Sequence, residues 1–280
     1  MFKKLFPNAL FGCLTLFGAQ HNSKTEQNSK TAQDDTEETG HFYVGVFGGG
    51  GGFGVSNFRQ TGTIFYPASS GGTTGVTATS GGRTTGAGFV GLQLGYLWPE
   101  LKDQKKPQSW ELKIGTEFEG YYIGTSLKPL LGSRTVTEGR FQDKFPINEG
   151  TLLAGGVLHF YAEEGKRFHP FVGGAVGAAV LTAHDATSFQ QSPPEPGINH
   201  FNTNTTATAW SFAAQGKIGL MFDIDEHFKA FAEYRFLYLT PASFTFGNTS
   251  YSNHPATSNW RVRFGNMYIN LGDAGIAYHF

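Results

Sequence analysis

From His41 onward, apolar and polar residues alternate along most of the chain. A period of two is typical of β-strands, in which successive side chains point to opposite faces. Eight segments show this period, and they cover residues 41–55, 85–98, 109–124, 150–161, 169–182, 206–222, 228–240 and 265–280. The sequence therefore predicts an all-β protein with eight main strands.

The connections between these segments alternate between long and short. The long ones cover 56–84, 125–149, 183–205 and 241–264. The short ones are "PELKDQKKPQ", "AEEGKRF" and "DIDEH". This alternation puts all the long connections on one side, so we expect an up-and-down meander. Long irregular loops are uncommon in compact soluble domains but are typical of one rim of a membrane barrel.

Each strand has an apolar face and a polar face. In the segment 109–124 the apolar face contains Trp110, Leu112, Ile114, Phe118 and Tyr122, and the other face contains Glu111, Lys113, Glu117 and Glu119. The later segments repeat the pattern, with Lys217, Glu233 and Arg235 opposite apolar residues. Alternation fits a soluble sandwich or lipocalin, with its apolar face inward, as well as a membrane barrel, with that face outward.

Three observations favour the membrane barrel. Aromatic residues lie at the strand ends nearest the short turns, as in the girdles of membrane barrels: Trp98, Trp110, Phe160, Phe222, Phe228 and Phe280. The charged face is also rich in glycine, which suits a narrow interior. Finally, the chain ends in "GDAGIAYHF", a strand whose last residue is aromatic.

This ending resembles the C-terminal assembly signal of bacterial outer-membrane barrels, carried here by Ile276, Tyr278 and Phe280. The stretch "GLMFDIDEHFKAFAEYRF" resembles the strand-turn-strand unit of OmpA-like and Opa-like eight-stranded proteins of the porin family. The resemblance covers 41–280. It implies an eight-stranded antiparallel up-and-down transmembrane β-barrel with four long extracellular loops and periplasmic termini. The implied location is the outer membrane of a Gram-negative bacterium, reached through the barrel-assembly machinery.

Composition narrows the function classes. The net charge of −1 gives no electrostatic reason to expect nucleic acid or another anionic partner. A mean hydropathy of −0.26, with no apolar run of transmembrane length beyond the N-terminus, argues against a helical membrane protein. Alternating strands average to mild polarity, so a β-barrel stays compatible with these values.

The N-terminus has the pattern of an export signal. "MFKK" is basic and "LFPNALFGCLTLFGA" is mostly apolar, which predicts a signal peptide over 1–19, cleaved after Ala19. Alternatively, "LFGC" is a lipobox and Cys13, the single cysteine, is acylated. Residues 20–40 contain one Ala and no larger apolar side chain, so we expect a disordered periplasmic tail before the barrel at 41–280.

The glycine run in "HFYVGVFGGGGGFGV" raises the question of a nucleotide site. Gly49, Gly51 and Gly54 satisfy the spacing G-x-G-x-x-G of dinucleotide-binding turns. No helix pattern follows them, however, and no acidic residue lies between Glu38 and Glu100 to hold a ribose. We therefore expect no cofactor. Inward glycines would instead leave room for bulky side chains, and outward ones would allow bending or close strand approach.

The interior of an eight-stranded barrel is just wide enough for side chains to fill it. Charged groups there must be paired, because an unpaired buried charge is costly. We therefore predict an interior network of Glu111, Lys113, Glu117, Glu119, Lys217, Glu233 and Arg235 that plugs the barrel. The alternative is that these charges line a narrow channel for ions or small solutes.

Metal binding and catalysis find little support in the sequence. None of the nine histidines is paired with another at a ligand spacing, so we expect no metal site. Some eight-stranded relatives modify lipid A with His and Ser. The only H-x-S here is His21 to Ser23, in the tail, and "HDATS", with His184, Asp185 and Ser188, is the other candidate. Chance explains that grouping equally well, and we expect no enzyme.

The long connections combine Ser, Thr, Asn and Gly with aromatic residues, a composition that suits adaptable contacts. Candidate contact residues are Phe65, Tyr66, Phe189, Phe201, Tyr251 and Trp260. The expected function is structural or surface-recognition, as in an adhesin or antigen, and a passive coat remains the alternative. Expected partners are outer-membrane lipid, lipopolysaccharide, the barrel-assembly machinery and host surface molecules.

Overall fold

The computed structural model of the protein describes residues 40–99, 110–133, 139–162 and 167–280. These residues form fifteen strands and one 3-10 turn, Ala68–Ser70. None of the described residues belongs to a helix long and apolar enough to cross a membrane. The predicted signal peptide, the lipobox and the tail up to residue 39 lie outside the described residues.

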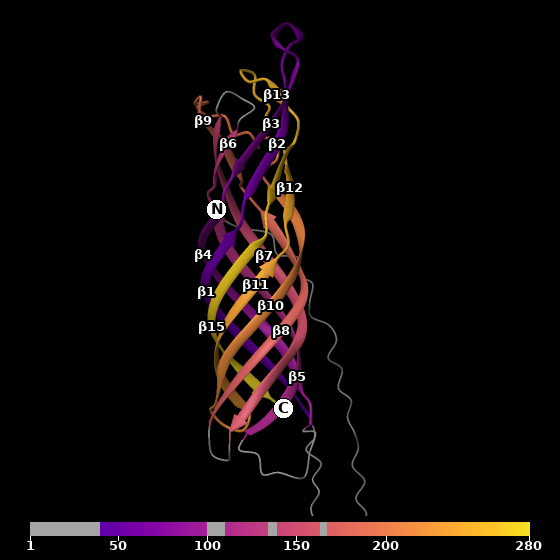
Figure 1. Ribbon diagram of the computed structural model, residues 1–280, viewed down its shortest axis with the longest axis vertical. Helices are drawn as coiled ribbons and strands as arrows, with labels where there is room; N and C mark the ends of the chain where they lie inside the picture. Colours follow the sequence, from indigo (N-terminus) through magenta and orange to yellow (C-terminus); the bar gives the residue numbers. More distant parts are fainter. Residues whose placement is uncertain (1–39, 100–109, 134–138, 163–166) are drawn as a thin grey trace, which may run out of the picture. The chain divides into compact units, whose positions relative to one another are not determined.

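Eight long strands close into an antiparallel barrel (Figure 1). They are β1 (His41–Val55), β4 (Arg83–Leu97), β5 (Trp110–Leu127), β7 (Arg140–Ala162), β8 (Phe168–Ala183), β10 (Ala207–Asp223), β11 (Phe228–Leu239) and β15 (Met267–His279). Each pairs with its neighbours in chain order, and β1 pairs with β15 to close the ring. The predicted eight-stranded meander is confirmed. The main difference is β7, which begins ten residues before its predicted start at 150.

The long connections are more regular than the sequence analysis assumed. Seven short strands lie in them: β2 (Phe58–Phe65), β3 (Thr73–Ser80), β6 (Leu130–Ser133), β9 (Thr187–Ser192), β12 (Ala242–Phe246), β13 (Ala256–Thr257) and β14 (Trp260–Phe264). With the first part of β7 they form a second sheet in the order β12-β14-β2-β3-β6-β7-β9, with β13 paired to β2. We call this second sheet and its connecting loops the extension. In Figure 1 it continues the barrel at the end opposite the C-terminus.

The extension forms because its short strands carry their own period-two pattern. In "ASFTF" and "WRVRF" alternate residues are buried, and in "FRQTGTIF" Phe58 and Gln60 are buried on either side of the exposed Arg59. Phe145, on β7, packs against aromatic rings of the extension, with ring centroids 5.3 Å from Phe264, 5.8 Å from Phe246 and 6.2 Å from Phe201. Pairing satisfies the backbone groups of these strands while the rings leave water. The extension is therefore a hydrophobic-cored sheet and not a set of irregular loops.

The described ends of the chain meet at the short-turn rim of the barrel. The backbone N–H of His279 donates to the carbonyl of His227, in the turn between β10 and β11. The N–H of Phe280 donates to the carbonyl of Phe42, at the start of β1. The barrel thus begins and ends on the rim opposite the extension.

Candidate functional site

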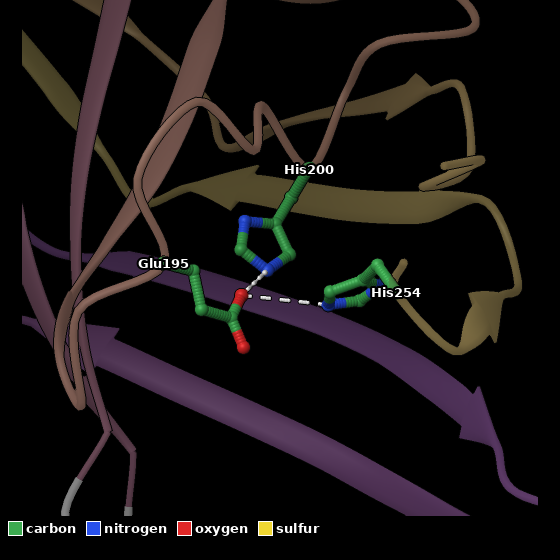
Figure 2. A group of neighbouring side chains, drawn as sticks. All are labelled: Glu195, His200 and His254. Atoms are coloured by element: carbon green, nitrogen blue, oxygen red, sulfur yellow. Dashed lines mark ion pairs between the residues drawn. The ribbon is translucent and has the colours of Figure 1, made fainter. Parts of the chain in front are cut away.

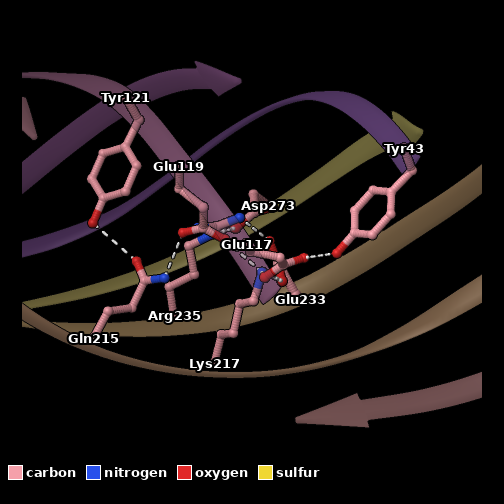
Figure 3. Close-up of polar contacts among 9 residues, drawn as sticks. All are labelled: Tyr43, Glu117, Glu119, Tyr121, Gln215, Lys217, Glu233, Arg235 and Asp273. Atoms are coloured by element: carbon pink, nitrogen blue, oxygen red, sulfur yellow. Dashed lines mark hydrogen bonds and ion pairs between the residues drawn. The ribbon is translucent and has the colours of Figure 1, made fainter. Parts of the chain in front are cut away.

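A cluster of charged and polar side chains fills the barrel interior (Figure 3). We call it the interior cluster. Five strands contribute to it, because their inward positions meet at one level of the barrel. The members are Tyr43 from β1, Glu117, Glu119 and Tyr121 from β5, Gln215 and Lys217 from β10, Glu233 and Arg235 from β11, and Asp273 from β15.

Two cations organise the interior cluster. Lys217 Nζ lies 2.6 Å from Glu117 Oε2 and 2.5 Å from Glu119 Oε1. Arg235 Nη1 donates to Glu119 Oε2 at 2.6 Å, its Nη2 donates to Glu233, and its Nε donates to Asp273 Oδ2 at 3.0 Å. The Arg235 guanidinium also lies 4.0 Å from the centre of the Phe47 ring. The planar guanidinium presents its donors in a rigid fork, so Arg235 pairs with three carboxylates at once in a fixed geometry.

Neutral groups complete the interior cluster. The Tyr43 hydroxyl donates to Glu117 Oε1 at 2.5 Å, and Gln215 Nε2 donates to Glu119 Oε2 at 2.7 Å. The Tyr121 hydroxyl donates to Gln215 Oε1 at 2.9 Å. Four carboxylates face two cations, so these neutral donors supply hydrogen bonds that the cations alone do not. Charges removed from water are retained only with this kind of pairing.

The structure brings together five of the seven predicted interior residues. The Nζ atom of Lys113 lies 5.3 Å from the centre of the Tyr161 ring, and the side chain of Glu111 lies outside the described residues. Sequence reasoning missed Tyr43, Tyr121, Gln215 and Asp273 as members of the interior cluster. All four occupy inward positions of the alternation, so parity along the strands would have found them.

The glycine run of β1 faces the closing strand β15. A Cβ atom at Gly49 would collide with the carbonyl oxygen of Gly272, and one at Gly51 would collide with that of Asn270. Both glycines therefore permit close backbone approach, although they share the inward parity of Phe47 and Phe53. All three glycines of the nucleotide-like spacing lie within a continuous strand, so no phosphate-binding turn is formed.

The outward face of the barrel is an exposed apolar belt. Its members include Leu152 (72% exposed), Phe118 (64%), Val90 (61%), Leu92 (60%) and Ile218 (59%). Trp98, Phe168, Phe228 and Phe280 are exposed near the short-turn rim, and Trp210, Tyr122, Tyr234 and Tyr268 nearer the extension. Of the other predicted girdle residues, Phe160 and Phe222 are half-buried, and the side chain of Trp110 lies outside the described residues. Apolar side chains outside and ionised groups inside define a transmembrane β-barrel.

Comparison with known proteins finds solved structures that are weakly similar to this chain. The sequence matches no protein-family model and no curated protein. Among solved structures, it is similar to Neisserial surface protein A, with 11% identity over 85% of this chain and 97% of that chain and a TM-score of 0.34. It is also similar to OprG from Pseudomonas aeruginosa, with 16% identity, 87% and 97% coverage and a TM-score of 0.36. The outer-membrane protein AlkL shares 12% identity over 91% and 97%, with a TM-score of 0.27. Scores this low support no functional conclusion.

The predicted contact residues of the loops fall into two groups. Phe65 and Phe189 are exposed, while Tyr66 and Tyr251 are half-buried. Phe201 and Trp260 are buried, so their assignment as contact residues is wrong. Phe201 packs in the core of the extension, and the Trp260 indole N–H donates to the Thr249 hydroxyl at 3.1 Å. These two aromatic side chains form part of the core of the extension, which was not predicted from the sequence.

The "HDATS" group does not present an accessible nucleophile. Ser188 is fully buried in β9, and its hydroxyl accepts a hydrogen bond from Gln60 Nε2 at 3.3 Å. Asp185 is exposed in the turn between β8 and β9. The hydroxyl is therefore in the interior of the extension and not on a surface that lipid could reach.

Two further groups of polar side chains lie in the extension. Arg59, Thr61, Arg261 and Arg263 line a cavity of about 310 Å³ on the outer face of β2 and β14. Glu195, His200 and His254 lie together in the loops, although 54 residues separate the two histidines in the sequence (Figure 2). Burial lowers the pKa of His200, which favours its neutral imidazole.

Proposed function

We propose that this protein is an outer-membrane β-barrel of a Gram-negative bacterium that displays a rigid extracellular surface for recognition. The observation that carries the proposal is the extension. A passive coat has no need of a hydrophobic core, whereas a core holds exposed side chains in fixed positions and lowers the entropic cost of binding. In this proposal the extension is outside the cell, and the short turns and both termini face the periplasm.

The packing of the interior argues against the alternative of a channel. The interior cluster occupies the barrel, and the aromatic core around Phe145 lies beyond it toward the extension. In planar bilayers we expect no steady conductance from the purified protein. A steady conductance that disappears on Glu117→Ala would instead favour an ion path through the interior cluster.

The lipid A-modifying alternative is disfavoured by the burial of Ser188. We expect the lipid A mass spectrum of cells to stay unchanged when the protein is expressed. A modified lipid A that reverts to the unmodified form in a His184→Ala variant would revive that alternative.

The exposed arginines of the extension suggest which chemical groups this region binds. Arg59 and Arg263 are opposite each other in the pairing of β2 with β14, and Arg263 precedes β15 by four residues. Guanidinium groups bind phosphate in a bidentate manner. Phosphate groups of lipopolysaccharide, at the outer edge of the apolar belt, are therefore the proposed partners of Arg59, Arg261 and Arg263.

Two experiments test this function. Membrane fractionation should recover the protein with the outer membrane, and its gel mobility should shift on boiling; a protein recovered in the soluble fraction would contradict the barrel assignment.

Cells that display the protein should then bind host cells or matrix more than cells that lack it. The double variant Phe65→Ser and Phe189→Ser, at two exposed positions, should reduce this binding. Unchanged adherence with or without the protein would overturn the recognition role.

A further inference from the structure

Three potential metal ligands converge in the loops of the extension (Figure 2). Glu195 and His200 lie between β9 and β10, and His254 lies between β12 and β13. The Oε2 atom of Glu195 lies 3.4 Å from Nε2 of His200 and 3.4 Å from Nε2 of His254. All three ligand atoms lie within 4.8 Å of one another.

Hydrogen bonds to the backbone decide which ring nitrogens are free. His200 Nδ1 lies 3.0 Å from the carbonyl oxygen of Ser188, and His254 Nδ1 lies 2.6 Å from that of Pro255. A carbonyl oxygen only accepts, so each Nδ1 must carry the hydrogen. In the neutral ring each Nε2 then presents a lone pair, and both lone pairs face the same carboxylate oxygen. Metal-bound histidines are commonly oriented by this kind of second hydrogen bond.

The Glu195 carboxylate faces the two histidines, which form ion pairs with it only when they are protonated. Glu195 Oε2 is buried and accepts no hydrogen bond among the described residues. Three electron-pair donors thus face one another with no hydrogen between them in the neutral state, and their lone pairs repel. His200 is almost fully buried, and its ring packs against Phe141 and Trp260 at centroid distances of 5.4 and 5.6 Å. A cation at the centre would remove the repulsion.

The spacing suits a small transition-metal ion. Ligands about 2.0–2.1 Å from a tetrahedral Zn²⁺ lie about 3.3 Å from one another. The two N–O separations of 3.4 Å are close to that value. Imidazole nitrogens favour Zn²⁺ and its transition-metal neighbours, whereas Ca²⁺ and Mg²⁺ prefer all-oxygen sites.

We propose that Glu195, His200 and His254 bind a divalent transition-metal ion of the Zn²⁺ type, with water as the fourth ligand. The ion ties the segment after β9 to the segment after β12, which come from the third and fourth long connections. The single cysteine, Cys13, lies far from these loops in the sequence, so a disulfide cannot perform this role within 41–280. The metal would hold part of the recognition surface in place.

Metal titration of the full-length, untagged protein in detergent micelles tests the site. We expect one Zn²⁺ per chain in competition with a chromophoric chelator. Glu195→Gln and His254→Gln should each weaken binding at least about tenfold. His184→Gln changes a loop histidine outside the group and should leave binding unchanged. Equal affinity in all four proteins, or preferential binding of Ca²⁺, would overturn the proposal.

A second measurement guards against loss of binding through misfolding. Hydrogen exchange should slow in 195–204 and 249–257 when Zn²⁺ is added to the wild type, with no change in the barrel strands. In Glu195→Gln, the gel mobility of the folded barrel should be retained while the Zn²⁺-dependent protection is lost. If Zn²⁺ protects these segments equally in the variant, the three side chains are not its ligands. The proposal is independent of whether the extension binds host surfaces.

Discussion

The barrel and the extension use the same alternation in opposite ways. In the barrel, the apolar Phe118 is 64% exposed and its neighbour Glu119 is buried. In the extension, Val262 is buried and its neighbour Arg261 is exposed. The difference lies in the solvent: hydrocarbon accepts the apolar face of one region, and water accepts the polar face of the other. Alternation therefore reveals two faces of a strand without saying which one is inside.

Strand β7 crosses from one region to the other. Its inward side chains keep one parity throughout, from Phe141 and Phe145 to Val157. Its outward side chains change, from the exposed Arg140 and Lys144 to the exposed Leu152 and Leu158. The change in outward polarity places the edge of the apolar belt nearest the extension between Lys144 and Leu152.

The largest expected effect comes from removing an interior charge. Arg235→Ala should lower the free energy of unfolding by about 3–5 kcal/mol, because Glu119, Glu233 and Asp273 lose their shared partner. Arg261→Ala, on the exposed face of the extension, should change it by less than about 0.5 kcal/mol. Urea unfolding in lipid vesicles measures both. Similar losses for the two variants would contradict the contrast between the regions.

Adding a charge to the outward face of the barrel should have the second-largest effect on the free energy of unfolding. Leu152→Arg puts a cation on the apolar belt and should cost about 2–4 kcal/mol near the bilayer centre. Leu130→Arg makes the same change at an exposed position of β6 in the extension and should be nearly neutral. The same vesicle assay applies. A neutral Leu152→Arg would mean that water, and not lipid, surrounds that position.

Closure of the barrel is tested at the glycine run. Gly51→Ala should cost about 1–3 kcal/mol, because its Cβ would meet the backbone of β15. Gly52→Ala, one residue away, would make an ordinary contact with Thr84 Cγ2 at 3.5 Å and should be tolerated. The fraction of protein that folds into vesicles, read from gel mobility, distinguishes them. Equal folding of the two variants would show that β1 and β15 can move apart.

The stability of the extension should also depend on pH, because a carboxyl group is buried in its interior. Burial raises the pKa of Asp143 to about 8, whereas an unfolded aspartate titrates near about 4. Between these values the folded state binds the extra proton, so the extension loses stability as pH rises, by at most about 1.4 kcal/mol per pH unit. Asp143→Asn should remove this dependence, measured by hydrogen exchange of β9. A wild-type extension that gains stability between about pH 5 and 8 would contradict the assignment.

Much of the barrel could be predicted because its signals are local. A period of two, the lengths of the connections and the parity of Glu117, Glu119, Lys217, Glu233 and Arg235 are all visible within single strands. The extension was harder, because short strands such as "WRVRF" also pair with a strand from a distant connection, here β2 of the first long connection. The assignment of Trp260 as a contact residue failed for the same reason.

The linear chain was enough to locate the eight strands and to separate their two faces, since backbone geometry couples each residue to its neighbours in sequence. Only the folded chain joins Arg235 to Asp273 across adjacent strands and brings Glu195 and His200 to His254. Those contacts depend on strand register and on the path of long connections, which arise from the packing of the whole barrel and its extension. The candidate metal site therefore forms only in the folded chain.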